Sequence, residues 1–134
     1  MFPEHYYEQV LVTPYVRYQG PLAEQSELWL KDETRQVGKS FKFRGTYHRL
    51  LEEPVGSTVV TASTGNHGMG VALAARLREQ QVLVFVPAHI STVKAQALEE
   101  LGATVEKVKG GYDECVQKAL HFSAEHGAPY ISWS

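Results

Sequence analysis

The sequence has little cysteine, with Cys115 the single one among 134 residues. One thiol cannot form an internal disulfide, which excludes a small secreted domain held by disulfides. A reducing compartment suits such a chain, and we expect a cytoplasmic protein. Cys115 itself is expected to be a small core or half-buried residue rather than a nucleophile.

The chain also has no surplus of basic residues. Thirteen lysines and arginines stand against fifteen aspartates and glutamates, giving a formal net charge of -2 at pH 7. Neither nucleic acid nor an anionic membrane surface is therefore an expected partner. No apolar run approaches the ~20 residues of a membrane span. The first twelve residues carry acidic side chains early and lack the apolar core of a signal peptide. The histidines show no metal-ligand spacing, so no metal site is expected.

Strand-like and helix-like segments alternate regularly after residue 55, within a chain that is 43% hydrophobic. Such alternation is typical of βαβ units, and near-continuous apolar runs favour strands covered on both faces. The sequence predicts an α/β fold: a four-stranded parallel, three-layer (αβα), Rossmann-like small domain with right-handed crossovers. The predicted strands are 58–63, 82–87, 103–109 and 128–132, and the predicted helices are 66–79, 91–102 and 112–127.

The inward faces of the three helices follow from their apolar spacing. They are expected to be Met69, Leu73 and Leu77; then Val93, Ala97 and Leu101; then Val116, Ala119, Leu120 and Ser123.

The first part of the chain reads differently. Residues 1–27 look irregular or lightly helical, and 27–33 looks like a strand. Ser40 can cap a helix that runs to about Glu53 and is stopped by the following proline. Its expected apolar stripe is Phe43, Tyr47, Leu50 and Leu51.

The turn ASTGNHG, residues 62–68, lies where a buried strand becomes a helix. Ligands of open α/β sheets bind at the carboxyl ends of strands, and the free N–H groups of a helix start attract an anion. A plain strand-to-helix turn with Thr64 or Asn66 as the cap explains the same residues, and spacing alone leaves both readings open.

Lys42 falls in the first turn of a predicted helix, where the helix dipole disfavours a cation. Lys39 and Arg44 are close in sequence and disfavour its charged form further. A free amine is a nucleophile that forms a Schiff base with an aldehyde. The alternative is that Lys42 points into solvent, where water screens the dipole.

Two nucleotide-binding motifs are not satisfied. Gly65, Gly68 and Gly70 follow the order G-x-x-G-x-G rather than G-x-G-x-x-G. The string Gly38-Lys39-Ser40 resembles the end of a P-loop, but Glu33 occupies the first glycine position, where a carboxylate would repel phosphate.

Taken together, three stretches resemble the fold-type II pyridoxal-phosphate enzymes, the tryptophan synthase β-like superfamily, and most of all its threonine/serine dehydratase branch. They are LWLKDETRQVGKSFKFRG, TASTGNHGMGVALAARL and VPAHISTVKAQALEELGATV. The pair S-F-K-x-R-G and S-T-G-N-H, in this order and about twenty residues apart, is specific to that superfamily.

The resemblance implies pyridoxal 5'-phosphate as cofactor and a role for each matched residue. Lys42 matches the catalytic lysine that carries the cofactor as a Schiff base and shuttles the proton at the substrate α-carbon. Asn66 matches the residue that hydrogen-bonds the cofactor's ring hydroxyl, and Phe41 the residue beside its ring. The loop that receives the substrate carboxylate is matched by Ser63, Thr64, Gly65, Asn66 and His67.

The implied reaction is deamination of a hydroxy amino acid to a keto acid and ammonia. Thr64 leaves subclasses open, because some racemases of the family carry serine there and some synthases threonine. β-Replacement or synthase chemistry and racemisation are thus alternatives. A non-catalytic module that binds an anion or a partner is an alternative of another class.

The chain departs from the family pattern in two places. The usual T-G-S before the lysine reads Gly38-Lys39-Ser40, which adds a charge. Family members continue for roughly another 180 residues, and that part carries the glycine-rich phosphate cradle and the group facing the pyridine nitrogen. Gly110-Gly111 is too short to replace the cradle. The chain alone is therefore expected to be weak or inactive.

The resemblance places residues 1–54 in the N-terminal part of a second, larger α/β domain and 55–134 in the small domain. Leu28, Leu30, Tyr47 and Leu51 should then be partly exposed, and such patches favour a homo-oligomer, most simply a dimer.

Overall fold

A computed structural model describes residues 2–3, 5–24 and 26–133. Expectations that fall on Met1, Glu4, Gln25 and Ser134 lie outside these residues. The helices and strands follow in the order α1 (Tyr6–Gln9), β1 (Tyr15–Arg17), β2 (Trp29–Lys31), α2 (Lys42–Leu51), β3 (Thr58–Ala62), α3 (Asn66–Leu77), β4 (Gln81–Pro87), α4 (Thr92–Glu100), β5 (Thr104–Val108) and α5 (Tyr112–His126). None of the helices in the described part of the chain combines the length and apolarity needed to cross a membrane.

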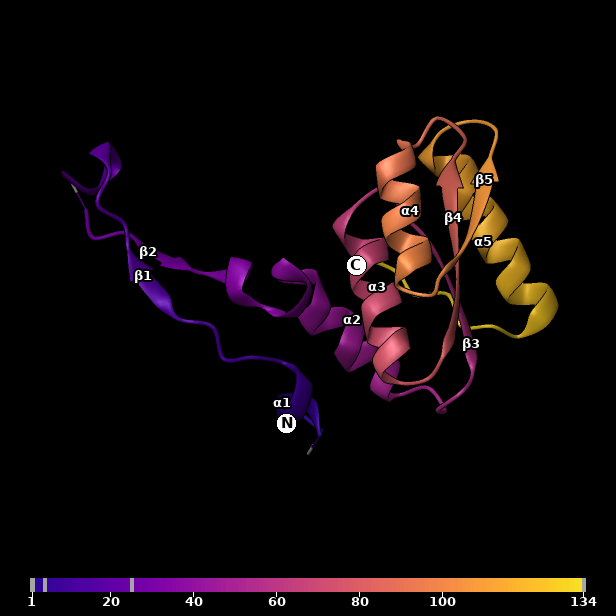
Figure 1. Cartoon of the computed structure of the whole chain (residues 1–134), viewed down its shortest axis with the longest axis horizontal. Helices are drawn as coiled ribbons and strands as arrows, with labels where there is room; N and C mark the ends of the chain where they lie inside the picture. Colours follow the sequence, from indigo (N-terminus) through magenta and orange to yellow (C-terminus); the bar gives the residue numbers. More distant parts are fainter. Residues whose placement is uncertain (1, 4, 25, 134) are drawn as a thin grey trace.

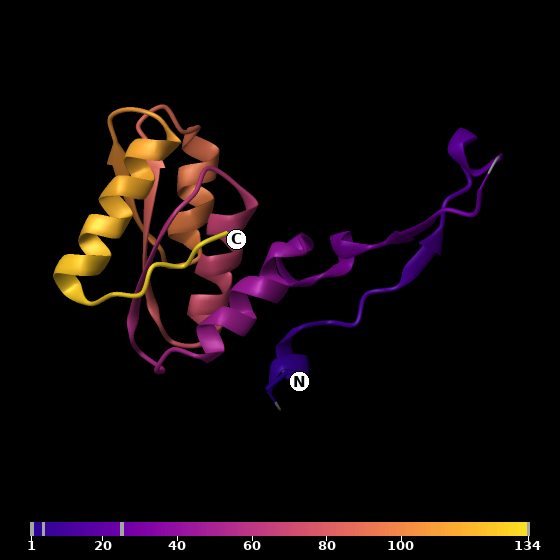
Figure 2. The same cartoon turned by 180° about the vertical axis from the view of Figure 1, so that it is seen from behind.

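The three strands β3, β4 and β5 form a parallel sheet in that spatial order. Val59 pairs with Val82, and Leu83 pairs with Thr104. Helices α3 and α4 cover one face of the sheet and α5 covers the other (Figures 1 and 2). Strands β3 and β4 are covered on both faces, and their fully buried residues include Val59, Val60, Val84 and Val86. The expected parallel, three-layer α/β architecture is confirmed.

The fourth expected strand, 128–132, is reduced to a single parallel bridge between Tyr130 and Val60. The Val60 N–H donates to the Pro129 carbonyl at 3.0 Å, and the Ile131 N–H donates to the Val60 carbonyl at 2.8 Å. Pro129 has no N–H to donate, so it limits the ladder here. The segment nevertheless lies along β3 and reaches its carboxyl end.

Helix α2 packs on α3 at very short range. Phe43 and Leu50 of α2 share one buried core with Val71 and other small residues of α3. Gly70 lies at the point of closest approach: a Cβ there would lie 3.1 Å from the Thr46 hydroxyl and 3.4 Å from the Lys42 carbonyl carbon. The missing side chain of Gly70 therefore lets the first turn of α2 lie directly against α3.

The helix faces agree with those expected only in part. Ala119 is buried as expected, and Met69, Leu73, Leu101 and Val116 are partly buried against the cores. Leu77, Val93 and Leu120, in contrast, are 42%, 76% and 43% exposed. The other buried positions are occupied mainly by small residues, namely Gly68, Gly70, Val71, Ala72, Ala74 and Ala75 in α3, Ala95 and Leu98 in α4, and Cys115 in α5. Close packing on the sheet and on α2 selects these small residues over larger ones nearby. The expectation for Cys115 is confirmed, since its side chain is fully buried.

Strands β1 and β2 pair antiparallel, with Tyr15 opposite Lys31, and project from the α/β body as an arm (Figures 1 and 2). All of their residues are exposed. The expected exposure of Leu30 is confirmed, whereas Tyr47 is buried at 5% because it packs within the core of α2 and α3. The division at residues 54 and 55 stays a prediction.

The arm is fixed to α2 through Glu33 and Arg44. Arg44 Nε and Nη2 donate to the two carboxylate oxygens of Glu33 at 2.9 and 2.8 Å, and Nη2 also donates to the Leu11 carbonyl at 3.0 Å. Both side chains are mostly shielded, at 17% exposure for Glu33 and 26% for Arg44. Hydrogen bonds from Arg44 lower the pKa of Glu33 to about 2 from its usual 4.5.

Because the folded state holds Glu33 ionised, its contribution to stability is complete above pH 4.5 and is lost as the pH falls toward 2. Glu33→Gln should lower the free energy of unfolding by about 2 kcal/mol at pH 7, the range of hydrogen bonds to charged groups. The difference from wild type should shrink between pH 4.5 and pH 2 in urea unfolding curves. The exposed Arg17–Glu27 pair is the control, and Glu27→Gln should have almost no effect. An equal loss at both sites would contradict the assignment.

Two glycine substitutions test the packing of α2 on α3. Gly70→Ala should destabilise the protein by about 1–3 kcal/mol, because the added methyl group overpacks a closed contact. Gly45→Ala, also in a helix but with no atom within 4 Å of the new Cβ, should stabilise it by about 0.5–1 kcal/mol. Thermal unfolding measures both, and a stabilising Gly70→Ala would refute the close contact.

Candidate active site

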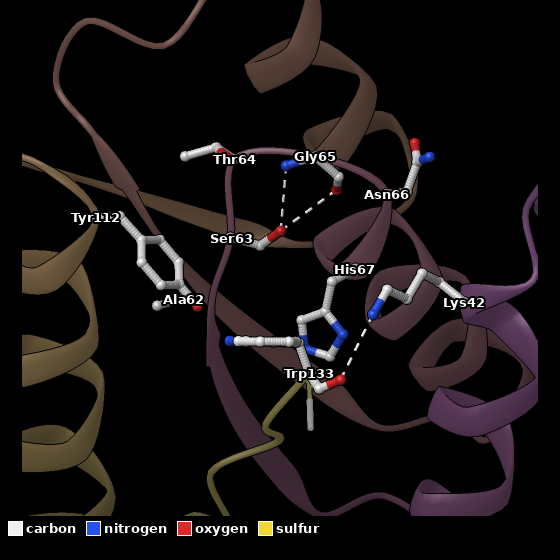
Figure 3. Close-up of a pocket in the computed structure, with 9 residues that line it drawn as sticks. All are labelled: Lys42, Ala62, Ser63, Thr64, Gly65, Asn66, His67, Tyr112 and Trp133. Atoms are coloured by element: carbon white, nitrogen blue, oxygen red, sulfur yellow. Dashed lines mark hydrogen bonds between the residues drawn. The ribbon is translucent and has the colours of Figure 1, made fainter.

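A cavity of about 380 Å³ lies at the carboxyl end of β3, within the size range of small-molecule sites. Its lining residues come from segments far apart in the sequence (Figure 3). They are Lys42, Ala62, Ser63, Thr64, Gly65, Asn66, His67, Tyr112 and Trp133. None of these nine residues is acidic. The loop 63–67 leads into the N-terminus of α3, where backbone N–H groups attract an anion. The cavity therefore suits an anionic ligand.

The loop 63–67 divides into inward and outward residues. Ser63 is buried, and its hydroxyl accepts from the backbone N–H groups of Gly65 at 3.2 Å and Gly68 at 2.8 Å. The Ser63 side chain therefore caps α3 from within. Thr64, Gly65 and Asn66 are exposed and form the rim of the cavity. In Figure 3 the Asn66 amide extends away from the Lys42 amine.

Gly68 is required by this arrangement. A Cβ at Gly68 would lie 2.9 Å from the Ser63 Cβ and 3.1 Å from its hydroxyl oxygen. No real side chain fits at that distance, so a larger residue at position 68 would displace the cap.

The His67 side chain also turns inward and is 8% exposed. Its Nε2 lies 3.0 Å from the Ile131 carbonyl oxygen and 3.1 Å from the Thr61 hydroxyl. Burial lowers the pKa of His67, and the nearby charge of Lys42 lowers it further. At neutral pH the imidazole is uncharged.

Lys42 is the first residue of α2 and is half-buried. The residue directly before α2 is Phe41 rather than the expected cap Ser40, but the Ser40 hydroxyl accepts from the Lys42 backbone N–H at 3.3 Å. The Lys42 amine reaches the cavity and donates to the Trp133 carbonyl at 3.4 Å (Figure 3). It lies 5.2 Å from the Phe41 ring centre and 5.6 Å from that of Trp133. Aromatic faces attract a cation at such distances.

Phe41 stands apart from the other expected site residues. It is 60% exposed and lines an adjacent hollow that shares Lys42, His67 and Trp133 with the main cavity. The structure thus brings Lys42 and the 63–67 loop together in one cavity and places Phe41 beside them.

Lys39, which stands where the family pattern has glycine, has a φ of 54° and is exposed. This left-handed conformation is one that glycine adopts without steric cost. The backbone at Lys39 therefore has a conformation that glycine would favour, although the residue there is a lysine.

Tyr112 and Trp133 were not expected in the site. Tyr112 follows Gly110-Gly111 at the end of β5, and Trp133 follows the 128–132 segment along β3. Ligand sites of parallel sheets lie at the carboxyl ends of strands. Tyr112 and Trp133 come shortly after the third and fourth predicted strands, and this position could have identified them as site residues.

The structure also shows what a phosphate group would meet near Gly110 and Gly111. The Gly111 N–H donates to the Glu114 carboxylate at 2.7 Å, and a Cβ at Gly110 would touch the same carboxylate. A bound carboxylate excludes phosphate, so this pair does not form a cradle. Lys42 and the exposed 64–66 loop fit the reactive end of pyridoxal phosphate and a carboxylate. In the described part of the chain, no three His, Cys, Asp or Glu side chains cluster as a metal site would need.

Comparisons with known proteins agree on one family. The family model described as pyridoxal-phosphate dependent enzyme matches residues 7–133. The biosynthetic L-threonine dehydratase IlvA of Haemophilus influenzae is 35% identical over 130 residues, which is 93% of this chain and 25% of that protein. The chain thus spans about a quarter of the length of this curated relative.

Solved structures are similar in the same way. The processed form of threonine deaminase isoform 2 from Solanum lycopersicum has a TM-score of 0.85 and 28% identity, covering 96% of this chain and 36% of that one. A pyridoxal 5'-phosphate-dependent aspartate racemase has a TM-score of 0.80 and 29% identity, covering 98% of this chain and 44% of that one.

Proposed function

Because this chain belongs to the pyridoxal-phosphate-dependent enzymes, we propose that it acts as a lyase of the threonine/serine dehydratase type. Its substrate would be a hydroxy amino acid, released as a keto acid and ammonia. The observation that carries the proposal is the Lys42 amine, which reaches a cavity without acidic lining, beside the helix N-terminus formed by the 63–67 loop.

Each site residue has a role in this proposal. Lys42 would hold the cofactor through its aldehyde, and its amine, once displaced by the substrate's amino group, would take the proton from the substrate α-carbon. The backbone of the 63–67 loop, with Thr64 on its rim, binds the substrate carboxylate. Asn66 holds the ring hydroxyl of the cofactor, and Phe41 flanks the ring. When bound, pyridoxal phosphate supplies the electron sink for the charge left on the α-carbon.

The inward side chains of the loop support these roles without joining the chemistry. Ser63 accepts from the N–H groups of Gly65 and Gly68 and so fixes the shape of the turn that would receive the carboxylate. The aromatic rings of Phe41 and Trp133 lie within reach of the Lys42 amine and help to hold it in the cavity.

Racemisation is the second candidate, and Thr64 is the observation that favours it. Its exposed side chain sits on the cavity rim, where a hydroxyl group can move a proton on the face opposite a lysine. β-Replacement remains an alternative on the same site. A non-catalytic module that binds an anion would use the loop without the Lys42 amine. Serine, threonine and aspartate offered with the cofactor separate dehydration, which gives a keto acid, from racemisation, which gives the inverted amino acid. β-Replacement and the non-catalytic module both give neither product.

The first test is borohydride reduction after adding pyridoxal phosphate, followed by peptide mapping. We expect an imine absorbance band and the label on Lys42. Lys42→Ala should remove both, whereas Lys39→Ala, which changes an exposed neighbouring lysine, should keep them. Labels scattered over surface lysines, or none at Lys42, would count against a preformed site.

Self-association is a further part of the proposal, with a homodimer as the simplest form. The arm exposes Tyr15, Val16, Trp29 and Leu30 at 67%, 44%, 53% and 47%. Val16 pairs with Leu30, so these two exposed apolar side chains lie on one face of the arm, and exposed apolar surface favours association. Light scattering after size exclusion should give a mass above the 15.0 kDa of one chain. The double substitution Val16→Lys and Leu30→Lys should shift it to the monomer, and a wild-type monomer at high concentration would refute the idea.

A further inference from the structure

His67 is a buried histidine that the proposed chemistry does not use. Three polar atoms meet at its Nε2 end. The Ile131 carbonyl oxygen lies 3.0 Å from Nε2 and 2.8 Å from the Thr61 hydroxyl, and Nε2 lies 3.1 Å from that hydroxyl. These three distances are all of hydrogen-bond length.

Only one arrangement of protons satisfies all three contacts. A carbonyl oxygen can only accept, so both Nε2 and the Thr61 hydroxyl must direct a proton to the Ile131 oxygen. If Nε2 carried a lone pair instead, it would face that oxygen at 3.0 Å as a second acceptor. The His67 imidazole is therefore protonated at Nε2.

The proton on Nε2 decides what the other ring nitrogen offers. Burial and the charge of Lys42 lower the pKa of His67, so Nδ1 carries a lone pair at neutral pH. In Figure 3, Nδ1 lies on the side of the ring that faces Lys42. The imidazole thus turns its donor toward the 128–133 segment and its acceptor toward the amine.

The carbonyl that His67 holds belongs to the segment that confines Lys42. Ile131 is two residues before Trp133, whose carbonyl accepts from the Lys42 amine and whose ring lies 5.6 Å from it. The ladder along β3 ends at the Ile131 N–H, which donates to the Val60 carbonyl. Beyond that point, Thr61 of β3 and His67 of α3 both contact the Ile131 carbonyl.

We propose that His67 is a positioning residue: its Nε2–H and the Thr61 hydroxyl fix the Ile131 carbonyl, and so hold Trp133 where it orients the Lys42 amine for reaction with an aldehyde. The inference rests on the proposed function for its last step only. The orientation of Trp133 and the protonation of His67 are properties of the chain without cofactor.

The protonation state is tested by ¹⁵N NMR of histidine-labelled protein at pH 7. We expect His67 to be neutral with its proton on Nε2. A proton on Nδ1, or a doubly protonated ring at pH 7, would overturn the proposal. This measurement needs no substitution and no cofactor.

The positioning role is tested by His67→Leu, with His67→Gln as the conservative variant and His121→Leu as the control on an exposed helix face. In a Trp29→Phe background, Trp133 is the one tryptophan left. Time-resolved fluorescence anisotropy should show greater local motion of Trp133 in His67→Leu. His67→Gln, whose amide can donate to Ile131, should restore the wild-type signal, and His121→Leu should leave it unchanged.

The rate of imine formation at Lys42 completes the test. With pyridoxal phosphate at pH 7 it should fall about tenfold in His67→Leu, which corresponds to 1.4 kcal/mol, and should recover in His67→Gln. Unchanged anisotropy and rate in His67→Leu would refute the positioning role. If His67→Leu does not fold, failure of His67→Gln to keep the wild-type anisotropy refutes it, and retention of the signal supports it. A wild-type chain with no adduct at Lys42 would refute the proposed function, while NMR and anisotropy would still decide on His67.

Discussion

The contact between α2 and α3 at Gly70 determines the geometry of the candidate site. Lys42 and the 63–67 loop are about twenty residues apart and belong to different helices. They meet because Gly70 of α3 has no side chain to keep the helices apart. A Cβ at Gly70 would lie 3.1 Å from the Thr46 hydroxyl and 3.4 Å from the Lys42 carbonyl carbon. The same contact buries Phe43 and Leu50. The core and the site therefore share one constraint, so a change in helix spacing alters both.

The sheet and its covering helices were predictable because they depend on local patterns. A parallel sheet follows from the alternation of strands with helices, without reference to distant residues. The strands 58–62 and 81–87 are also rich in β-branched residues. The helix faces were less predictable, because small residues occupy many of the close contacts of α2, α3 and the sheet. Larger residues such as Leu77 and Val93 are exposed instead. Strand β1 was missed because three exposed residues carry no alternation of burial.

The candidate site was predictable where its residues are contiguous. Lys42 and the 63–67 loop stand in two short motifs, and each motif carries its own local geometry. Which side chains of the loop point inward was not predictable. The inward turn of His67 depends on Ile131, 64 residues later, and the position of Trp133 depends on the bridge at Tyr130. Long-range contacts of this kind leave no spacing in the sequence, although the carboxyl ends of the strands mark where to look.

The attachment of the arm has a mechanical consequence. Glu33 and Arg44 join the base of the β1–β2 arm to α2, and Arg44 is two residues after Lys42 in the same helical turn. A force applied to the arm would therefore reach the first turn of α2, which carries Lys42, through this ion pair.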